Sequence, residues 1–131
     1  MFVFEAMKRR VHTVGMDESA DLASDALHFS GYRHLPVVDA ENHVVGMLTP
    51  TDLLDFVQRR GAAEPVKVSE VMRSPVVSIR QDQDLEMALP KMRRANVHAL
   101  PVLDNLDHLA GILTDVDVLL ALAKDRPRGI D

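Results

Sequence analysis

Short apolar runs separated by polar stretches dominate the chain, and they come in two similar sets. In the first half, residues 35–38 and 44–48 are apolar runs on either side of the polar stretch 39–43. In the second half, residues 100–103 and 109–113 flank the polar stretch 104–108 in the same way. Runs of this length bounded by turn-forming residues predict a strand, a turn and a second strand in each half.

A helical pattern precedes each pair of strands. Residues 18–30 carry an apolar face at helical spacing, and the second half offers the same face. These faces consist of Ala20, Ala23, Ala26 and Leu27 in the first half and of Leu85, Ala88, Leu89 and Met92 in the second. Asp17 and Asp82 are the predicted N-caps. Pro90 lies inside the second helix and is predicted to kink it, while Gly31 and Asn96 are predicted to end the two helices.

The remaining elements are shorter or follow the strands. A helical turn is expected at residues 3–8 and 68–73, and a brief strand at 11–14 and 76–79. A last helix begins near Pro50 and near Asp115, with Thr49 and Thr114 as predicted N-caps. The order in each half is therefore β-α-β-β-α, which is an α+β class.

The two halves are copies of each other at a constant spacing. Adding 65 to a residue number in the first half gives its match in the second, as Pro36 gives Pro101, and no gap is needed. An internal repeat of this kind decides the architecture before any single motif does. We expect one repeat at residues 1–60, a linker at 61–65, a second repeat at 66–124 and a flexible tail at 125–131.

Composition and charge exclude several classes of protein. The chain has 131 residues, of which 47% are hydrophobic, and this is a globular composition. The net charge of −5 argues against general nucleic-acid binding. Without cysteine, disulfides, thiol catalysis and thiolate metal sites are excluded. The sequence holds no run typical of a signal peptide or a membrane span, so we expect a cytoplasmic protein without membrane association.

One seven-residue motif occurs in both repeats, at the point where a strand is predicted to run into a helix. It reads Gly46-Met47-Leu48-Thr49-Pro50-Thr51-Asp52 and Gly111-Ile112-Leu113-Thr114-Asp115-Val116-Asp117. A hydroxyl and free backbone N–H groups at a helix start can face an anion, and a carboxylate can accept from two sugar hydroxyls. The motif is also explained without a ligand, because threonine caps helices and aspartate offsets the helix dipole. Both interpretations stay open at this point.

The last helix of each repeat has more apolar residues than one buried face needs. Leu53, Leu54, Phe56 and Val57 cover more than one face in the first repeat, and residues 118–122 are apolar almost all round in the second. A helix that is apolar all round is buried all round. The pattern predicts a homodimer, and the alternative is that these helices pack on each other within the chain.

These residues resemble a tandem pair of cystathionine β-synthase-like (CBS) domains, also called a Bateman module. The resemblance rests on residues 35–39 (Leu-Pro-Val-Val-Asp) followed by the motif, and on residues 100–104 (Leu-Pro-Val-Leu-Asp) followed by its second copy. It implies two repeats that pack by their sheets about a pseudo-two-fold axis, with clefts between them. It also implies binding of adenosine-containing ligands such as AMP, ADP, ATP or S-adenosylmethionine, and no obligatory cofactor.

The family resemblance assigns roles to particular residues. Asp52 and Asp117 would hold ribose hydroxyls, and Thr49 and Thr114 would lie near the phosphate. The remaining candidates line the phosphate and base region: Thr51, Tyr32, Arg33, His34, Val97 and His98, with Val76 and Val77 for one cleft and Val11 and His12 for the other.

The two copies differ in charge near the motif. Arg33, His34 and Thr51 are available beside Asp52, whereas Ala99 and Asp115 accompany Asp117. Because like charges repel, we expect the Asp52 site to bind a phosphorylated ligand better. The Asp117 site is expected to remain empty or to prefer a less charged adenosyl ligand.

Catalysis is not expected, because two repeats fill the chain and no P-loop or nucleophile motif is present. The histidines form no metal-binding pattern, and no metal site is predicted. Two functions remain. The chain is either a ligand sensor that signals to a separate regulated protein by conformational change, or a dimerisation scaffold with empty clefts.

Overall fold

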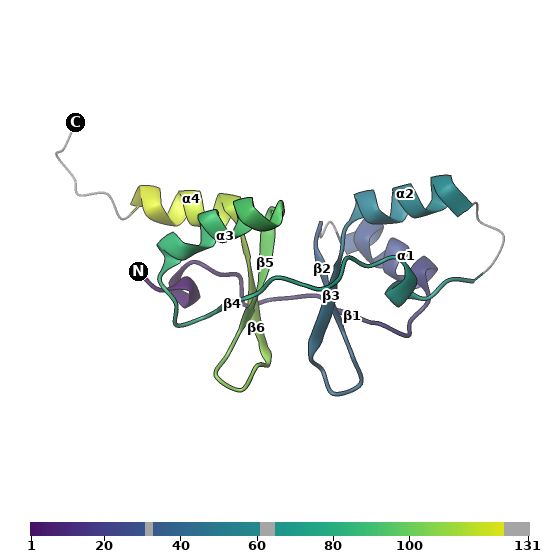
Figure 1. The fold of residues 1–131 in the computed structure, drawn as a ribbon, viewed down its shortest axis with the longest axis horizontal. Coiled ribbons are helices and arrows are strands. Elements are labelled where there is room, and N and C mark those ends of the chain that lie inside the picture. Colours follow the sequence, from purple (N-terminus) through teal and green to yellow (C-terminus); the bar gives the residue numbers. More distant parts are fainter. Residues whose placement is uncertain (31–32, 61–64, 125–131) are drawn as a thin grey trace. The chain divides into compact units, whose positions relative to one another are not determined.

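The computed structural model describes residues 1–30, 33–60 and 65–124, and its chain forms two compact units (Figure 1). The first-motif unit comprises Val11–Val76 and carries Asp52. The second-motif unit comprises Met1–Arg10 together with Val77–Asp131 and carries Asp117. Within the described residues, no helix combines the length and apolarity that crossing a lipid bilayer requires. The predicted α+β class with two repeats is confirmed, and each unit contains one three-stranded sheet.

The first-motif unit follows the predicted order of elements. It contains β1 (Val14–Gly15), α1 (Ala20–Ser30), β2 (Leu35–Val38), β3 (Val44–Leu48), α2 (Pro50–Arg60) and the 3-10 turn η2 (Val68–Glu70). The strand order is β1-β2-β3, with β1 parallel and β3 antiparallel to β2. Asp39 closes the β2–β3 turn, because its Oδ1 accepts the backbone N–H groups of Glu41 and His43.

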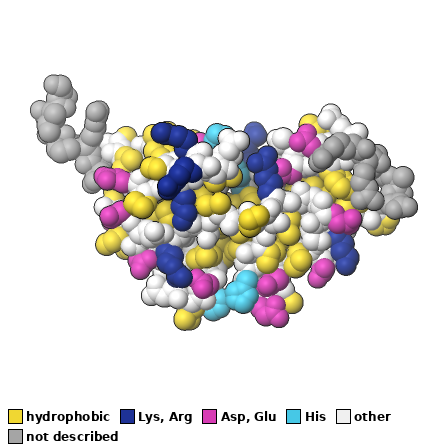
Figure 2. Space-filling model, viewed as in Figure 1, with side chains coloured by type: hydrophobic (Ala, Val, Ile, Leu, Met, Phe, Trp, Pro, Cys, Tyr) yellow, Lys and Arg dark blue, Asp and Glu magenta, His cyan; other side chains and the backbone are white. Residues whose placement is uncertain are grey.

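The second-motif unit repeats this plan. It contains η1 (Val3–Glu5), β4 (Ile79–Arg80), η3 (Leu85–Met87), α3 (Ala88–Ala95), β5 (Ala99–Leu103), β6 (Leu109–Thr114) and α4 (Asp115–Lys124). The strand order is β4-β5-β6 with the same directions. Asn96 caps α3 in the left-handed conformation with φ 56°, as predicted. Figure 2 shows acidic and histidine side chains gathered at the hairpin turns.

Each unit has its own aliphatic core, and the predicted inward helix faces contribute to both. Ala23 and Leu27 are buried in one core, and Leu85, Ala88 and Met92 in the other. Fully burying one leucine or methionine side chain contributes about 1.5–3 kcal/mol, so these cores supply the main stabilisation of each unit. Among the side chains that the structure describes, no phenylalanine or tyrosine belongs to either buried cluster, which agrees with the 4% aromatic content.

The opening segment of each repeat packs in the unit that carries the other motif. Val3 is fully buried in the core of the second-motif unit, and Val68 is fully buried in the core of the first-motif unit. The segments also join the sheets through isolated backbone bridges, Lys8 to Ile112 and Arg73 to Met47. Each unit is therefore the body of one repeat completed by the opening segment of the other. The boundaries of the compact units therefore do not coincide with those of the sequence repeats.

Several predicted boundaries were wrong. The strands β1 and β4 begin at Val14 and Ile79, so Val11, His12, Val76 and Val77 precede them. The reason is register, because only two residues of each strand pair with the neighbouring strand. The linker, apart from Pro65, and the tail lie outside the described residues.

The helix starts also differ from the prediction. Ser19, not Asp17, caps α1, since its Oγ accepts the backbone N–H of Asp21 at 3.2 Å. Asp82 precedes the turn η3, whose N-cap is Asp84. Pro90 does not interrupt a helix, because α3 begins at Ala88 and Pro90 falls in its first turn. Backbone N–H groups there have no partner within the helix, so proline removes nothing.

The last helices keep apolar side chains in solvent, as their sequence pattern indicated. Leu54 on α2 and Val116, Leu119 and Leu120 on α4 are each 57% exposed, whereas Val118 of α4 is fully buried. Packing within each unit therefore does not bury this apolar excess.

Candidate functional site

In both units the motif threonine and aspartate cap the same helix in a reciprocal way. The backbone N–H of Asp52 donates to Thr49 Oγ1 at 3.3 Å, and the backbone N–H of Thr49 donates to Asp52 Oδ2 at 3.0 Å. The matching distances at Thr114 and Asp117 are 3.1 and 3.0 Å. This is a capping box, which satisfies two donors at the start of α2 and of α4. The predicted N-caps at Thr49 and Thr114 are confirmed.

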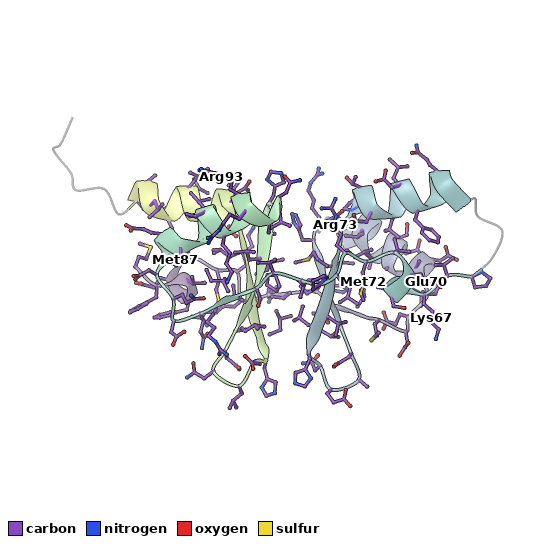
Figure 3. The ribbon with its side chains drawn as sticks, in the orientation of Figure 1. Lys67, Glu70, Met72, Arg73, Met87 and Arg93 are labelled. Carbon is purple, nitrogen blue, oxygen red and sulfur yellow. The ribbon has the colours of Figure 1, made fainter. Side chains whose placement is uncertain are left out.

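Each motif carboxylate also meets a cation from the opening segment that completes its unit, and Figure 3 labels one of these cations, Arg73. Arg73 Nε donates to Asp52 Oδ1 at 2.9 Å. Lys8 Nζ lies 3.4 Å from Asp117 Oδ1. The carboxylate side chains are nearly buried, with 8% and 12% of their surface exposed, whereas the two cations are more than half exposed. A buried carboxylate without such partners would be strongly destabilising.

Backbone pairing places these two cations. Arg73 and Met47 exchange two backbone hydrogen bonds, of 2.9 and 3.1 Å, and Lys8 and Ile112 exchange two of 2.9 Å. Since Met47 and Ile112 lie inside the motifs, this pairing fixes the backbone of each cation beside the motif that carries its carboxylate.

The motif glycines make this close pairing possible. A Cβ on Gly111 would lie 2.6 Å from the carbonyl oxygen of Lys8 and 2.8 Å from Met7 Sδ. A Cβ on Gly46 would meet Met72 Sδ and lie 3.0 Å from the carbonyl oxygen of Arg73. The glycine therefore leaves room for the opening segment, so every defined position of the motif has a structural role.

The two carboxylates differ in how many acceptor positions remain. A carboxylate has about four lone-pair positions. Asp52 uses three of them with described residues, because Thr49 Oγ1 donates to Oδ2 at 2.9 Å in addition to the Thr49 N–H and Arg73. Among the described residues, the Asp117 carboxylate accepts one hydrogen bond, from the Thr114 N–H, and has the longer ion pair with Lys8. Asp117 therefore has more capacity left for a ligand.

Of the described candidates expected beside Asp52, Arg33, His34, Thr51 and Val76 belong to the first-motif unit, whereas Val77 belongs to the second-motif unit. Arg33 and Thr51 are exposed, and His34 is half-buried. Val11 and His12 also lie in the first-motif unit. Val11 and His12 were expected beside Asp117, so their pairing with that residue stays a prediction. Tyr32 lies outside the described residues.

Val97 and His98, the described candidates expected beside Asp117, lie in the second-motif unit. His98 approaches Asp115, with Nδ1 3.0 Å from Asp115 Oδ2, and the backbone N–H of Asp115 donates to the His98 carbonyl. When His98 is protonated, it offsets the negative charge that Asp115 brings to this helix start.

Sequence reasoning missed Lys8 and Arg73 as site residues. Their signal was present in the repeat, because the two cations occupy equivalent positions and each follows a methionine that is also repeated, Met7 and Met72. Neither motif contains a lysine or arginine of its own, and the opening segments supply this positive charge.

The hairpin turns contain two further clusters of polar groups. Asp39, Glu41 and His43 hold one potential metal-ligand atom each within 4.8 Å of one another, and Glu41 and His43 are exposed. Turn closure already explains this geometry, and we assign no metal to it. In the other turn, backbone N–H groups of His108 and Leu106 hold the pKa of the Asp104 carboxyl below its usual value.

Comparison with known proteins identifies the repeats. The CBS domain family pattern matches residues 3–59 and again residues 68–124. The chain belongs to the CBS domain family. This tandem CBS pair is 30% identical to a CBS domain-containing protein of Dictyostelium discoideum over 95% of its own length and 92% of that protein. It is 28% identical, over 89% of its length, to a homoserine O-acetyltransferase of Methanohalobium evestigatum. The CBS pair spans only about a quarter of that enzyme, at 23% of its length.

Solved structures show the same fold. One CBS domain pair, in complex with 5′-methylthioadenosine and S-adenosyl-L-methionine, has a TM-score of 0.84 at 22% identity and covers 96% of this chain and 98% of that one. A second structure, of CBSX2 in complex with AMP, has a TM-score of 0.79 at 26% identity and covers 94% of this chain and 96% of that one. Similar CBS pairs thus bind adenosyl ligands.

Proposed function

We propose that this CBS pair is a regulatory module that binds an adenosine-containing ligand, such as AMP, ADP, ATP or S-adenosylmethionine, at its Gly-x-x-Thr-x-x-Asp motifs. The observation that carries the proposal is a capped helix start with a carboxylate, present twice, in a family with adenosyl-bound members. The carboxylates of Asp52 and Asp117 accept hydrogen bonds from the ribose hydroxyls. Thr49 and Thr114 lie beside the phosphate, and the N-terminal ends of α2 and α4 favour its negative charge.

The chain acts as a sensor and not as an enzyme in this proposal. Its motif residues cap helices and pair with cations, and these contacts hold a helix start and a carboxylate in place. The ligand shifts the protein between two shapes only by its different affinity for them. A separate protein of unknown identity reads the change. Small-angle scattering with and without AMP tests this step, and an unchanged profile at saturating AMP would contradict it.

A thermal-shift screen tests ligand binding first. A ligand that binds only the native state raises the unfolding midpoint by mass action. We expect at least one of AMP, ADP, ATP and S-adenosylmethionine to raise the midpoint. An unchanged midpoint with all four would reject the proposal.

The second candidate is a dimerisation scaffold with empty sites. It is favoured by the observation that capping, ion pairing and close packing already explain the motif without a ligand. A negative ligand screen combined with a stable dimer would support it.

Under either function we propose a homodimer through α2 and α4. Leu54, Val116, Leu119 and Leu120 are the exposed apolar residues that support it. Sedimentation of Leu119→Glu and Leu120→Glu variants tests this interface. We expect monomers, and an unchanged dimer would place the interface elsewhere.

A further inference from the structure

The Asp52–Arg73 ion pair stands where a ligand would bind, and this raises the question of what a ligand must do to it. The inference below rests on the proposed function. A ribose diol needs two acceptors when both hydroxyls donate to one carboxylate. Three of the four acceptor positions of Asp52 are already used by described residues. A diol therefore cannot bind through both hydroxyls unless one present donor leaves.

Arg73 is the donor that can leave most easily. Thr49 is held beside Asp52 by the capping box, so removing its donors would disturb the start of α2. The Arg73 side chain is 58% exposed and reaches Asp52 only through Nε. Its backbone stays fixed on Met47, so a displaced guanidinium remains near the motif. Its two terminal nitrogens make no hydrogen bond to any described residue.

The displaced guanidinium gains a new partner only if the ligand brings an anion. Arginine binds a phosphate through two parallel N–H donors. A phosphorylated ligand therefore replaces the lost Asp52–Arg73 ion pair with an ion pair between Arg73 and its phosphate. An uncharged nucleoside breaks the Asp52–Arg73 pair and offers Arg73 no anion in exchange. We propose that Arg73 selects the charge of the ligand at the first motif, favouring a phosphorylated adenosyl ligand over the uncharged nucleoside.

The second motif provides the contrast within one chain. Asp117 has unused acceptor positions, and Lys8 lies 3.4 Å away without the directed Nε hydrogen bond that Arg73 makes. A diol can bind Asp117 while Lys8 stays in place. The second motif therefore discriminates less between charged and uncharged adenosyl ligands. The two equivalent cations thus give the two sites different ligand preferences.

The test measures AMP and adenosine binding by calorimetry in an Asp117→Asn background, so that only the first motif responds. Arg73→Gln should raise the affinity for adenosine and lower that for AMP, so that the ratio of the two affinities falls roughly tenfold or more. Lys67→Gln is the matched control. It removes the same charge from the same segment, but Lys67 Nζ faces Asp17 at 3.7 Å instead of the motif. Its affinity ratio should not change.

The outcomes separate this inference from the proposed function. If Arg73→Gln changes both affinities equally, or neither, the charge selection is overturned while ligand binding stands. Binding of adenosine to the Arg73→Gln variant, but not to its Asp117→Asn parent, supports both the charge selection and the proposed function. If neither ligand binds to any variant in the Asp117→Asn background, the charge selection is overturned, and the four-ligand thermal-shift screen of the wild type decides separately whether the proposed function fails. Arg73→Lys keeps the charge and guards against misfolding of the glutamine variant, and we expect an intermediate ratio because lysine lacks the bidentate geometry.

Discussion

Arg73 Nε lies 2.9 Å from Oδ1 of Asp52, although the two residues belong to different sequence repeats. The opening segment of the second repeat thus supplies a cation to Asp52, a nearly buried carboxylate of the first repeat. Lys8 and Asp117 form the equivalent pair at 3.4 Å. The motif that defines each repeat is therefore completed by a residue from the other.

A double-mutant cycle on Arg73→Met and Asp52→Asn should give a coupling free energy of about 1 kcal/mol, measured by urea unfolding. One partner is nearly buried, which strengthens the pair, and the other is exposed, which weakens it. The same cycle on Lys8 and Asp117 should give roughly half as much, because the distance is longer. A larger coupling for the Lys8 pair would contradict this ranking.

Replacing Gly111 by alanine should destabilise the protein by about 1–3 kcal/mol, since the added Cβ would force the Lys8 carbonyl away from the sheet. Chemical denaturation measures the loss. Gly15→Ala is the control, because its Cβ would lie 3.4 Å from the nearest atom, in the flexible side chain of Glu18. Equal losses at the two glycines would show that the close approach has no energetic consequence.

Thr49→Ala should cost about 0.5–2 kcal/mol, because the helix loses its N-cap acceptor and Asp52 loses a donor. Thr51→Ala is matched in chemistry and lies in the same helix, where its exposed hydroxyl caps nothing, so stability should not fall. Thermal unfolding of the two variants checks the difference. Equal midpoints would argue against the capping box.

The Asp104 carboxyl should titrate below its ordinary pKa of 3.8, because the backbone N–H groups of His108 and Leu106 favour its charged form. A depressed pKa stabilises the folded state above pH 3.8, and this stabilisation is lost as the pH falls through the lower folded-state value. Carbon-detected NMR titration reads the pKa directly. In Asp104→Asn the acid-induced loss of stability should be smaller, and a pKa at or above 3.8 would contradict the assignment.

Most of the fold was predictable because local signals agree with the tertiary structure. The strand pair around Asp39 and the cap at Asn96 are local, so sequence pattern and turn chemistry suffice to predict them. Ser19 and Pro90 were misjudged because a cap depends on where the first helical turn closes. A shift of one or two residues changes the capping residue and moves a proline from the middle of a helix to its start.

The candidate site was only partly predictable. Thr49 and Asp52 are three residues apart, so their capping contact follows from helical geometry. Arg73 is 21 residues from Asp52, and their contact depends on the opening segment packing in the unit of the other repeat. No local rule specifies that exchange. The one indication of this contact in the sequence is the cation that follows both Met7 and Met72.

The measurement that tests the central claim most directly is calorimetric titration of AMP into the wild-type protein and into the Asp52→Asn, Asp117→Asn and double variants. We predict saturable binding to the wild type, a larger loss of affinity for Asp52→Asn than for Asp117→Asn, and no binding to the double variant. Equal losses in the single variants would contradict the proposed difference between the sites. Unchanged AMP binding by the double variant would contradict the claim that the motif carboxylates hold the ligand.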